Sequence, residues 1–121
     1  MLWTSAYYAS LRGTKQSHNF KSMKRGGHVY FMTNKSKTTL YCGVTSNLVQ
    51  RVQQHKAHIY PKGFTARYNL ELLVYYEGFH RIEEAIAREK QIKAGSRKTK
   101  EQLIIALNPE WKDLFHEIIE W

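Results

Sequence analysis

The stretch HVYFMTNKSKTTLYCGVTSNLVQRVQQHK, residues 28–56, decides the fold that we predict. Residues 29–33 and 38–44 are rich in strand-forming side chains, and the run NKSK between them supplies turn residues. Residues 45–47, TSN, form a suitable N-cap cluster for a helix that runs to about His58. We therefore expect a β-hairpin followed by a helix.

The sequence after this stretch predicts one more strand and three more helices. LELLVYY (70–76) is an apolar run of the length of a buried strand. Helices are expected over residues 80–95 and 96–107, and a last one opens at Pro109. The order β-β-α-β-α-α-α indicates an α/β (α+β) domain with a small, mainly antiparallel three-stranded sheet flanked by helices.

The N-terminal segment differs from the rest of the chain. Residues 1–22 show no sustained helical or alternating pattern, and the sequence from Met23 reads like a natural start. We interpret 1–22 as a poorly ordered extension and 23–121 as the domain.

The charge points to a polyanionic partner. The chain has 121 residues with 19 Lys+Arg against 10 Asp+Glu, a formal net charge of +9. Nucleic acid is the first candidate and an anionic membrane the second; the alternative is a basic protein with neither partner. The one cysteine, Cys42, excludes an intrachain disulfide and fits a reducing cytoplasm. No apolar run approaches the roughly 20 residues that span a bilayer, so we expect no membrane segment.

Two tyrosines of the hairpin are candidates for one site. If the turn is 34–37, Thr33 pairs with Thr38 and Tyr30 lies opposite Tyr41 on the same face of the sheet. Their hydroxyls could then point into a shared site. Alternatively, the pair only stabilises the hairpin, and a slip of one residue would separate the two side chains.

The first helix adds a cation and a titratable group. Arg51 and His55 are i, i+4 neighbours on the flank of its apolar face. A guanidinium stays charged and can hold two phosphate oxygens. The alternative is an arginine that only extends into solvent and a histidine at the core boundary.

A carboxylate marks the second helix. Ile82, Ala85, Ile86 and Ile92 define its expected buried face, and Glu89 falls in the middle of that arc. A lone carboxylate at such a position is costly unless it is paired or bound to a cation. The alternative to a metal ligand is a structural ion pair, for example with Arg51.

Basic residues follow along the second half of the chain and could displace counterions from phosphates. The candidates for nucleic-acid binding are Lys62, Arg67, Arg88, Lys90, Lys93, Arg97 and Lys98. A solvated charged face is the alternative. Phe64 and Tyr68 could stack on bases, or they could anchor the core.

These features together resemble the GIY-YIG nuclease superfamily, in particular its small stand-alone bacterial proteins. The two signature tripeptides appear as HVY (28–30) and YCG (41–43). The match continues in order through GVTSNLVQRVQQHK, YNLELLVYYEGF, EEAIAREKQIK and LNPEWKDL. The departures are His28 for the usual glycine and Cys42 for the usual isoleucine or valine.

The resemblance implies a set of site residues and a chemistry. By position the catalytic residues would be Tyr30, Tyr41, Arg51, His55, Glu89 and Asn108. Glu89 would hold one Mg²⁺ (or Mn²⁺) that stabilises the leaving oxygen, and Arg51 would neutralise charge on the phosphate. Tyr30 or Tyr41 would take a proton from the attacking water, with His55 as relay.

The function that the resemblance implies is a metal-dependent endonuclease that hydrolyses DNA phosphodiester bonds, with branched or structured DNA among its candidate substrates. The alternative is a non-catalytic nucleic-acid-binding module that keeps the fold. A basic domain with a protein partner is a third hypothesis.

Overall fold

The computed structural model describes residues 26–121. Three antiparallel strands, β1 (Gly27–Thr33), β2 (Leu40–Thr45) and β3 (Leu72–Phe79), form one sheet in the order β2-β1-β3. The central strand β1 is buried along its whole length, and β2 is an edge strand. The predicted fold class is confirmed. The extension predicted at 1–22 lies outside the described residues.

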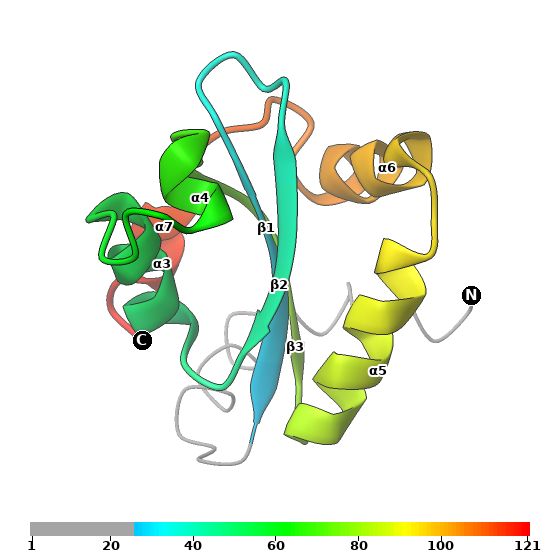
Figure 1. Cartoon of the computed structure of the whole chain (residues 1–121). Coiled ribbons are helices and arrows are strands. Elements are labelled where there is room, and N and C mark those ends of the chain that lie inside the picture. Colours follow the sequence, from blue (N-terminus) through cyan, green and yellow to red (C-terminus); the bar gives the residue numbers. More distant parts are fainter. Residues whose placement is uncertain (1–25) are drawn as a thin grey trace.

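Helices cover both faces of the sheet, which Figure 1 shows almost edge-on. One face, here called the α3 face, carries α3 (Leu48–Lys56), α4 (Phe64–Arg67) and α7 (Phe115–Ile118). The other face, the α5 face, carries α5 (Ile82–Lys93) and α6 (Arg97–Leu107). Among the residues described, no helix is long and apolar enough to cross a bilayer.

Two helices depart from the prediction. Helix α4 was not expected, because four residues are too few to show a helical period. The last helix begins at Phe115 instead of Pro109. The side chains of Asn108 and Asp113 accept hydrogen bonds from the amides of Lys112 and Phe115, and these local bonds hold the intervening residues in an irregular turn.

The hairpin contains the predicted turn, but strand pairing begins later than predicted. The Lys37 amide donates to the carbonyl of Asn34 at 2.9 Å. The Asn34 side chain then accepts from the amides of Thr38 at 2.9 Å and Thr39 at 3.3 Å, which keeps these amides out of the ladder. The first pair of the ladder is therefore Thr33 with Leu40.

This shift changes the partners of both tyrosines. Tyr30 pairs with Gly43, and Tyr41 pairs with Met32, so the predicted opposition of the two tyrosines is wrong. Because strand residues alternate between faces and the shift is two residues, Tyr30 and Tyr41 still share the α3 face. Their ring centroids lie 6.1 Å apart.

Helix α5 is rotated relative to the prediction. It buries Ala85, Arg88 and Ile92, whereas Ile86 is exposed and Glu89 lies at the flank of the buried face. The cause is an ion pair that the helical period does not reveal. Arg88 Nε donates to Glu77 Oε1 at 2.8 Å, and Glu77 on β3 is fully buried.

Candidate active site

A hydrogen-bonded chain links β1, α3 and α4 on the α3 face. The Tyr30 hydroxyl lies 2.8 Å from His55 Nε2. The other ring nitrogen, His55 Nδ1, lies 2.9 Å from Thr65 Oγ1. The Tyr41 ring packs edge-on against His55 with centroids 5.6 Å apart. The structure thus brings three of the predicted site residues together and adds Thr65, which orients the imidazole.

Gly43 makes room for this arrangement. A Cβ atom at position 43 would lie 2.6 Å from the Tyr30 hydroxyl oxygen and 2.8 Å from Cε2 of Tyr41. Such contacts are shorter than packed atoms tolerate. The phenol of Tyr30 therefore depends on a residue without a side chain at its partner position on β2.

The environment sets the protonation of the two linked groups. Burial raises the pKa of Tyr30 well above its usual value, the neighbouring Tyr41 raises it further, and the charge of Arg51 opposes both effects. Burial, reinforced by Arg51, lowers the pKa of His55 to about 4. At neutral pH both groups are uncharged, so His55 donates through one ring nitrogen and accepts through the other.

Arg51 is the cation of this cluster. It is half-buried on α3, and within residues 26–121 its guanidinium forms no salt bridge and no side-chain hydrogen bond. The ion pair with Glu89 that the sequence allowed is not formed. A partly desolvated guanidinium without a carboxylate partner can bind an anion.

Glu89 lies on the other face of the sheet from the tyrosines. Its Oε2 atom is 3.1 Å from the ammonium of Lys93, and its side chain is 16% exposed. Burial, followed by the charge of Glu89, raises the pKa of Cys42 to about 12, which indicates that the carboxylate lies near β2. The candidate groups therefore flank the edge strand, with Tyr41 on one face and Cys42 and Glu89 on the other.

The residues near Glu89 fit a hard divalent cation held by few protein ligands. Within the described part of the chain, no group of three or more His, Cys, Asp or Glu side chains could hold a metal ion. One carboxylate suits Mg²⁺, which keeps several water ligands. Cys42 stays a protonated thiol at neutral pH, which disfavours a soft metal. Glu89 already binds one cation in the structure, the ammonium of Lys93.

Two of the predicted nucleic-acid-binding arginines have partners within the domain, and only Arg97 of the two is exposed. Arg88 is buried in its ion pair with Glu77, so it offers no surface to a nucleic acid; this correction follows from the rotation of α5. Arg97 donates to Glu101 and to the carbonyls of Lys37 and Thr38, which ties α6 to the tip of the hairpin.

The remaining predicted cations lie at the surface. Lys62, Arg67, Lys90, Lys93 and Lys98 are exposed.

Asn108 holds the backbone together at the end of α6. It is 5% exposed, and its amide donates to the carbonyls of Val74 and Lys112 while its oxygen accepts from the Lys112 amide. Because these backbone bonds occupy its polar atoms, we omit it from the groups that could react with a substrate.

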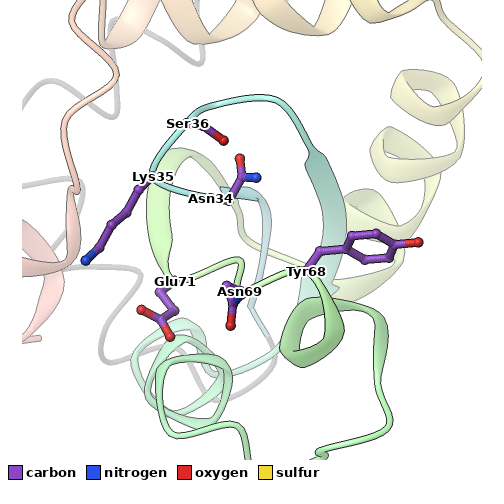
Figure 2. A pocket seen from close by; sticks show the side chains of 6 residues that line it. All are labelled: Asn34, Lys35, Ser36, Tyr68, Asn69 and Glu71. Carbon is purple, nitrogen blue, oxygen red and sulfur yellow. The ribbon is translucent and has the colours of Figure 1, made fainter.

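A polar pocket of about 470 Å³ opens beside α4, between the hairpin tip and the connection to β3. Figure 2 shows its lining residues Asn34, Lys35, Ser36, Tyr68, Asn69 and Glu71. The Tyr68 ring points away from the other five side chains. Three of its polar side chains are already engaged: Asn34 in the hairpin turn, Ser36 with Thr38 and Glu71 with His58.

Comparison with known proteins places this sequence in a family. The model of the GIY-YIG catalytic domain matches residues 26–102. A UPF0213 protein of Syntrophus aciditrophicus is 37% identical over 83 residues, which covers 69% of this chain and 93% of that protein. The UPF0213 protein NP_0776A of Natronomonas pharaonis is 36% identical over 77 residues, covering 64% of this chain and 89% of that protein. The solution structure of the UPF0213 protein BH0048 from Bacillus halodurans matches with a TM-score of 0.47 and 27% identity, over 73% of this chain and 92% of that chain.

Proposed function

Because the chain belongs to the GIY-YIG family, we propose that it is a metal-dependent endonuclease that hydrolyses DNA phosphodiester bonds. The observation that carries the proposal is Arg51, a partly buried guanidinium with no partner among residues 26–121, whose charge acts on Tyr30 and on the neutral His55. Such a group binds a phosphate diester and stabilises the charge that develops on it during attack.

The two phenols would have different tasks. Tyr30 is 1% exposed and its pKa is raised by burial, which disfavours it as a base toward water. Tyr41 is half-buried on the edge strand, so it can contact an incoming phosphate or water. We assign the contact with the attacking water to Tyr41. As Tyr41 takes a proton from the water, its own hydroxyl proton would pass to the Tyr30 hydroxyl. The Tyr30 proton would then move to the neutral His55 at Nε2, whose orientation Thr65 fixes.

Glu89 would hold the cation, Mg²⁺ or Mn²⁺. When bound there, the ion would supply positive charge for the leaving oxygen. Lys93 would have to release the carboxylate, which an exposed ammonium on a flexible stem can do at little cost. β2 is an edge strand, so the two faces of the sheet meet along its free edge. A nucleic-acid strand that crosses this edge could contact Tyr41 on one face and Glu89 on the other.

We propose DNA as the substrate, with branched or structured DNA included. The basic surface would hold it through phosphate contacts. The proposed location is the cytoplasm, where a single cysteine stays reduced.

Plasmid nicking tests the proposal. The full chain is incubated with supercoiled DNA and Mg²⁺, with and without a chelator, and compared with Glu89→Gln and with Glu83→Gln, an exposed carboxylate on the same helix. We expect cutting that requires Mg²⁺, persists in Glu83→Gln and falls at least about a hundredfold in Glu89→Gln. Equal cutting by both variants would contradict the role of Glu89.

One observation favours a second function, a non-catalytic nucleic-acid-binding module. Glu89 is occupied by Lys93 and lies on the opposite face from Tyr30. If the two sets of groups never meet on one phosphate, the chain binds DNA without cutting it. Salt-dependent DNA binding together with no nicking by the unmodified chain in Mg²⁺ or Mn²⁺ would support this alternative.

A further inference from the structure

Two large rings on α4 face solvent. Phe64 is 47% exposed and Tyr68, which caps the helix, is 45% exposed. Their ring centroids lie 4.7 Å apart. The residue that α4 buries is Thr65, a small polar one. The helix therefore turns its aromatic side chains outward, so these rings are not the core anchors that the sequence allowed.

The exposed rings continue into the candidate active site. The Phe64 ring lies 6.1 Å from that of Tyr41, at an interplanar angle of 31°. Tyr41, Phe64 and Tyr68 thus form an aromatic row that leads outward from His55. The hydrogen bond between Thr65 and His55 joins α4 to α3, which holds the row in place beside the site.

Positive charge accompanies the row. The Arg67 guanidinium carbon lies 5.9 Å from the centroid of the Tyr68 ring, and Lys62 is exposed just before α4. The charge of Arg51, which has no partner among residues 26–121, acts on His55 at the inner end of the row. A partner that fits must offer flat apolar faces together with repeated negative charge. Nucleobases on a phosphate backbone have both properties, whereas a lipid chain or an apolar protein helix has only a hydrocarbon surface.

We propose that Phe64 and Tyr68 form a stacking site for a nucleobase of the strand whose phosphate lies at Tyr41 and Arg51. This inference rests on the proposed function for the position of that phosphate. It adds a contact that nucleic-acid backbone binding alone does not supply. The base could come from an unpaired strand or could be turned out of a duplex, since both expose the same flat face.

Binding without cutting tests the proposal. Fluorescence anisotropy in chelator measures the affinity of the full chain for a labelled single-stranded DNA and for the same strand in a duplex. The variants are Phe64→Leu and Tyr68→Leu, which keep apolar volume but remove the flat ring, and Phe64→Trp, which keeps a ring. Tyr60→Leu is the control, because Tyr60 is 57% exposed on the same connection but lies outside the row.

We expect each leucine variant of the row to weaken binding by roughly tenfold, and Phe64→Trp and Tyr60→Leu to bind like the unmodified chain. A second measurement moves a single abasic site along the strand. One position should weaken the unmodified chain by a similar factor and leave Phe64→Leu unaffected, because the ring and base act as a pair. A loss confined to the single strand identifies an unpaired base; a loss with the duplex as well identifies a base turned out of it.

The proposal is overturned if the leucine variants, folded by circular dichroism, bind both DNAs as tightly as the unmodified chain; a protein partner would then remain for the rings. This result differs from failure of the nuclease proposal. A chain that nicks DNA but binds without any effect of Phe64 or Tyr68 loses only the stacking site. A chain that never nicks but shows the ring-dependent affinity keeps it.

Discussion

On the α3 face of the sheet the buried network around His55 is neutral, whereas on the α5 face the buried network around Glu77 contains an ion pair. Tyr30 on β1, His55 on α3 and Thr65 on α4 form an uncharged hydrogen-bonded chain. Under α5, the buried carboxylate of Glu77 accepts hydrogen bonds from Arg88 and from the Tyr75 hydroxyl.

The difference separates groups that stabilise the fold from groups that can react. The buried charges of the α5 face satisfy each other, so they serve packing and helix orientation. The α3 face leaves Arg51 without a partner among the described residues, and its neutral network adds no negative charge that would occupy it. Anion binding is therefore expected from the α3 face, and the main stability effects from the α5 face.

Removing one half of the buried ion pair should have the largest effect. Arg88→Met leaves the carboxylate of Glu77 buried without its main partner, and we expect it to lower the free energy of unfolding by about 3–5 kcal/mol. Urea denaturation measures the loss. The control is Lys90→Met, an exposed position on the same helix, which should change stability by less than about 0.5 kcal/mol.

The double variant Glu77→Gln/Arg88→Met sharpens this test. Because it removes both charges, it should recover part of the lost stability. If Arg88→Met unfolds no more easily than Lys90→Met, the buried pair does not have the structural role assigned to it.

Arg51→Lys should separate reaction from stability on the other face. An ammonium cannot hold two phosphate oxygens as the planar guanidinium does, so nicking should fall about a hundredfold. The unfolding free energy should stay within about 0.5 kcal/mol, because the guanidinium has no salt-bridge or side-chain hydrogen-bond partner among residues 26–121 to lose. Arg81→Lys, an exposed arginine, is the control for both measurements. A large loss of stability in Arg51→Lys would show that the residue serves packing.

Acid should weaken the fold through histidines of the α3 face. Burial lowers the pKa of His28 to about 4, and that of His55 is also about 4, against 6.5 in an unfolded chain. Above pH 6.5 both states are neutral and stability is complete; between pH 6.5 and 4 only the unfolded chain takes up protons, so stability falls. By pH 5 we expect a loss of about 1–2 kcal/mol per histidine, measured by urea denaturation across this range.

His28→Phe isolates one of the two contributions. The His28 ring packs against Trp121 and Tyr76, with centroids 5.1 and 6.3 Å away, so a phenyl ring keeps the packing and removes the titration. The slope of stability against pH should become shallower in this variant and stay unchanged in His116→Gln, which alters an exposed histidine. An unaltered slope in His28→Phe would assign the acid sensitivity to other groups.

The smallest effect is expected at Lys93. Lys93→Met frees the carboxylate of Glu89 from a half-exposed ammonium, so the Mg²⁺ concentration for half-maximal nicking should fall by a few-fold. DNA affinity in chelator, measured separately, reports any phosphate contact that the lysine also makes. A higher Mg²⁺ requirement in Lys93→Met would mean that the ammonium assists the cation instead of competing with it.

The sequence predicted most of the elements and the face on which the tyrosines meet. Alternation along β1 and β2 fixes the face even when the register moves by two residues, so the proximity of Tyr30 and Tyr41 survived an error in the turn. The register itself depended on the side chain of Asn34, whose hydrogen bonds to two amides have no signature in strand propensity.

The orientation of α5 and the role of α4 could not be predicted from the sequence, for other reasons. Apolar spacing favoured Ile86 as buried, yet the ion pair of Arg88 with Glu77 on β3 turns the buried face of α5 toward Arg88. Thr65 carried no signal as a site residue, because its role follows from contact with a histidine on another helix. The one usable signal for Glu77 was a carboxylate at the end of an apolar strand.

The space above Gly43 has a consequence for how this chain tolerates variation. The hydroxyl of Tyr30 occupies the volume where any other residue would begin its side chain. A saturation library at position 43, selected for activity, should therefore return glycine alone, while neighbouring Cys42 should accept other small apolar residues. The absence of a side chain at position 43 should therefore be as strictly required for activity as a reacting group.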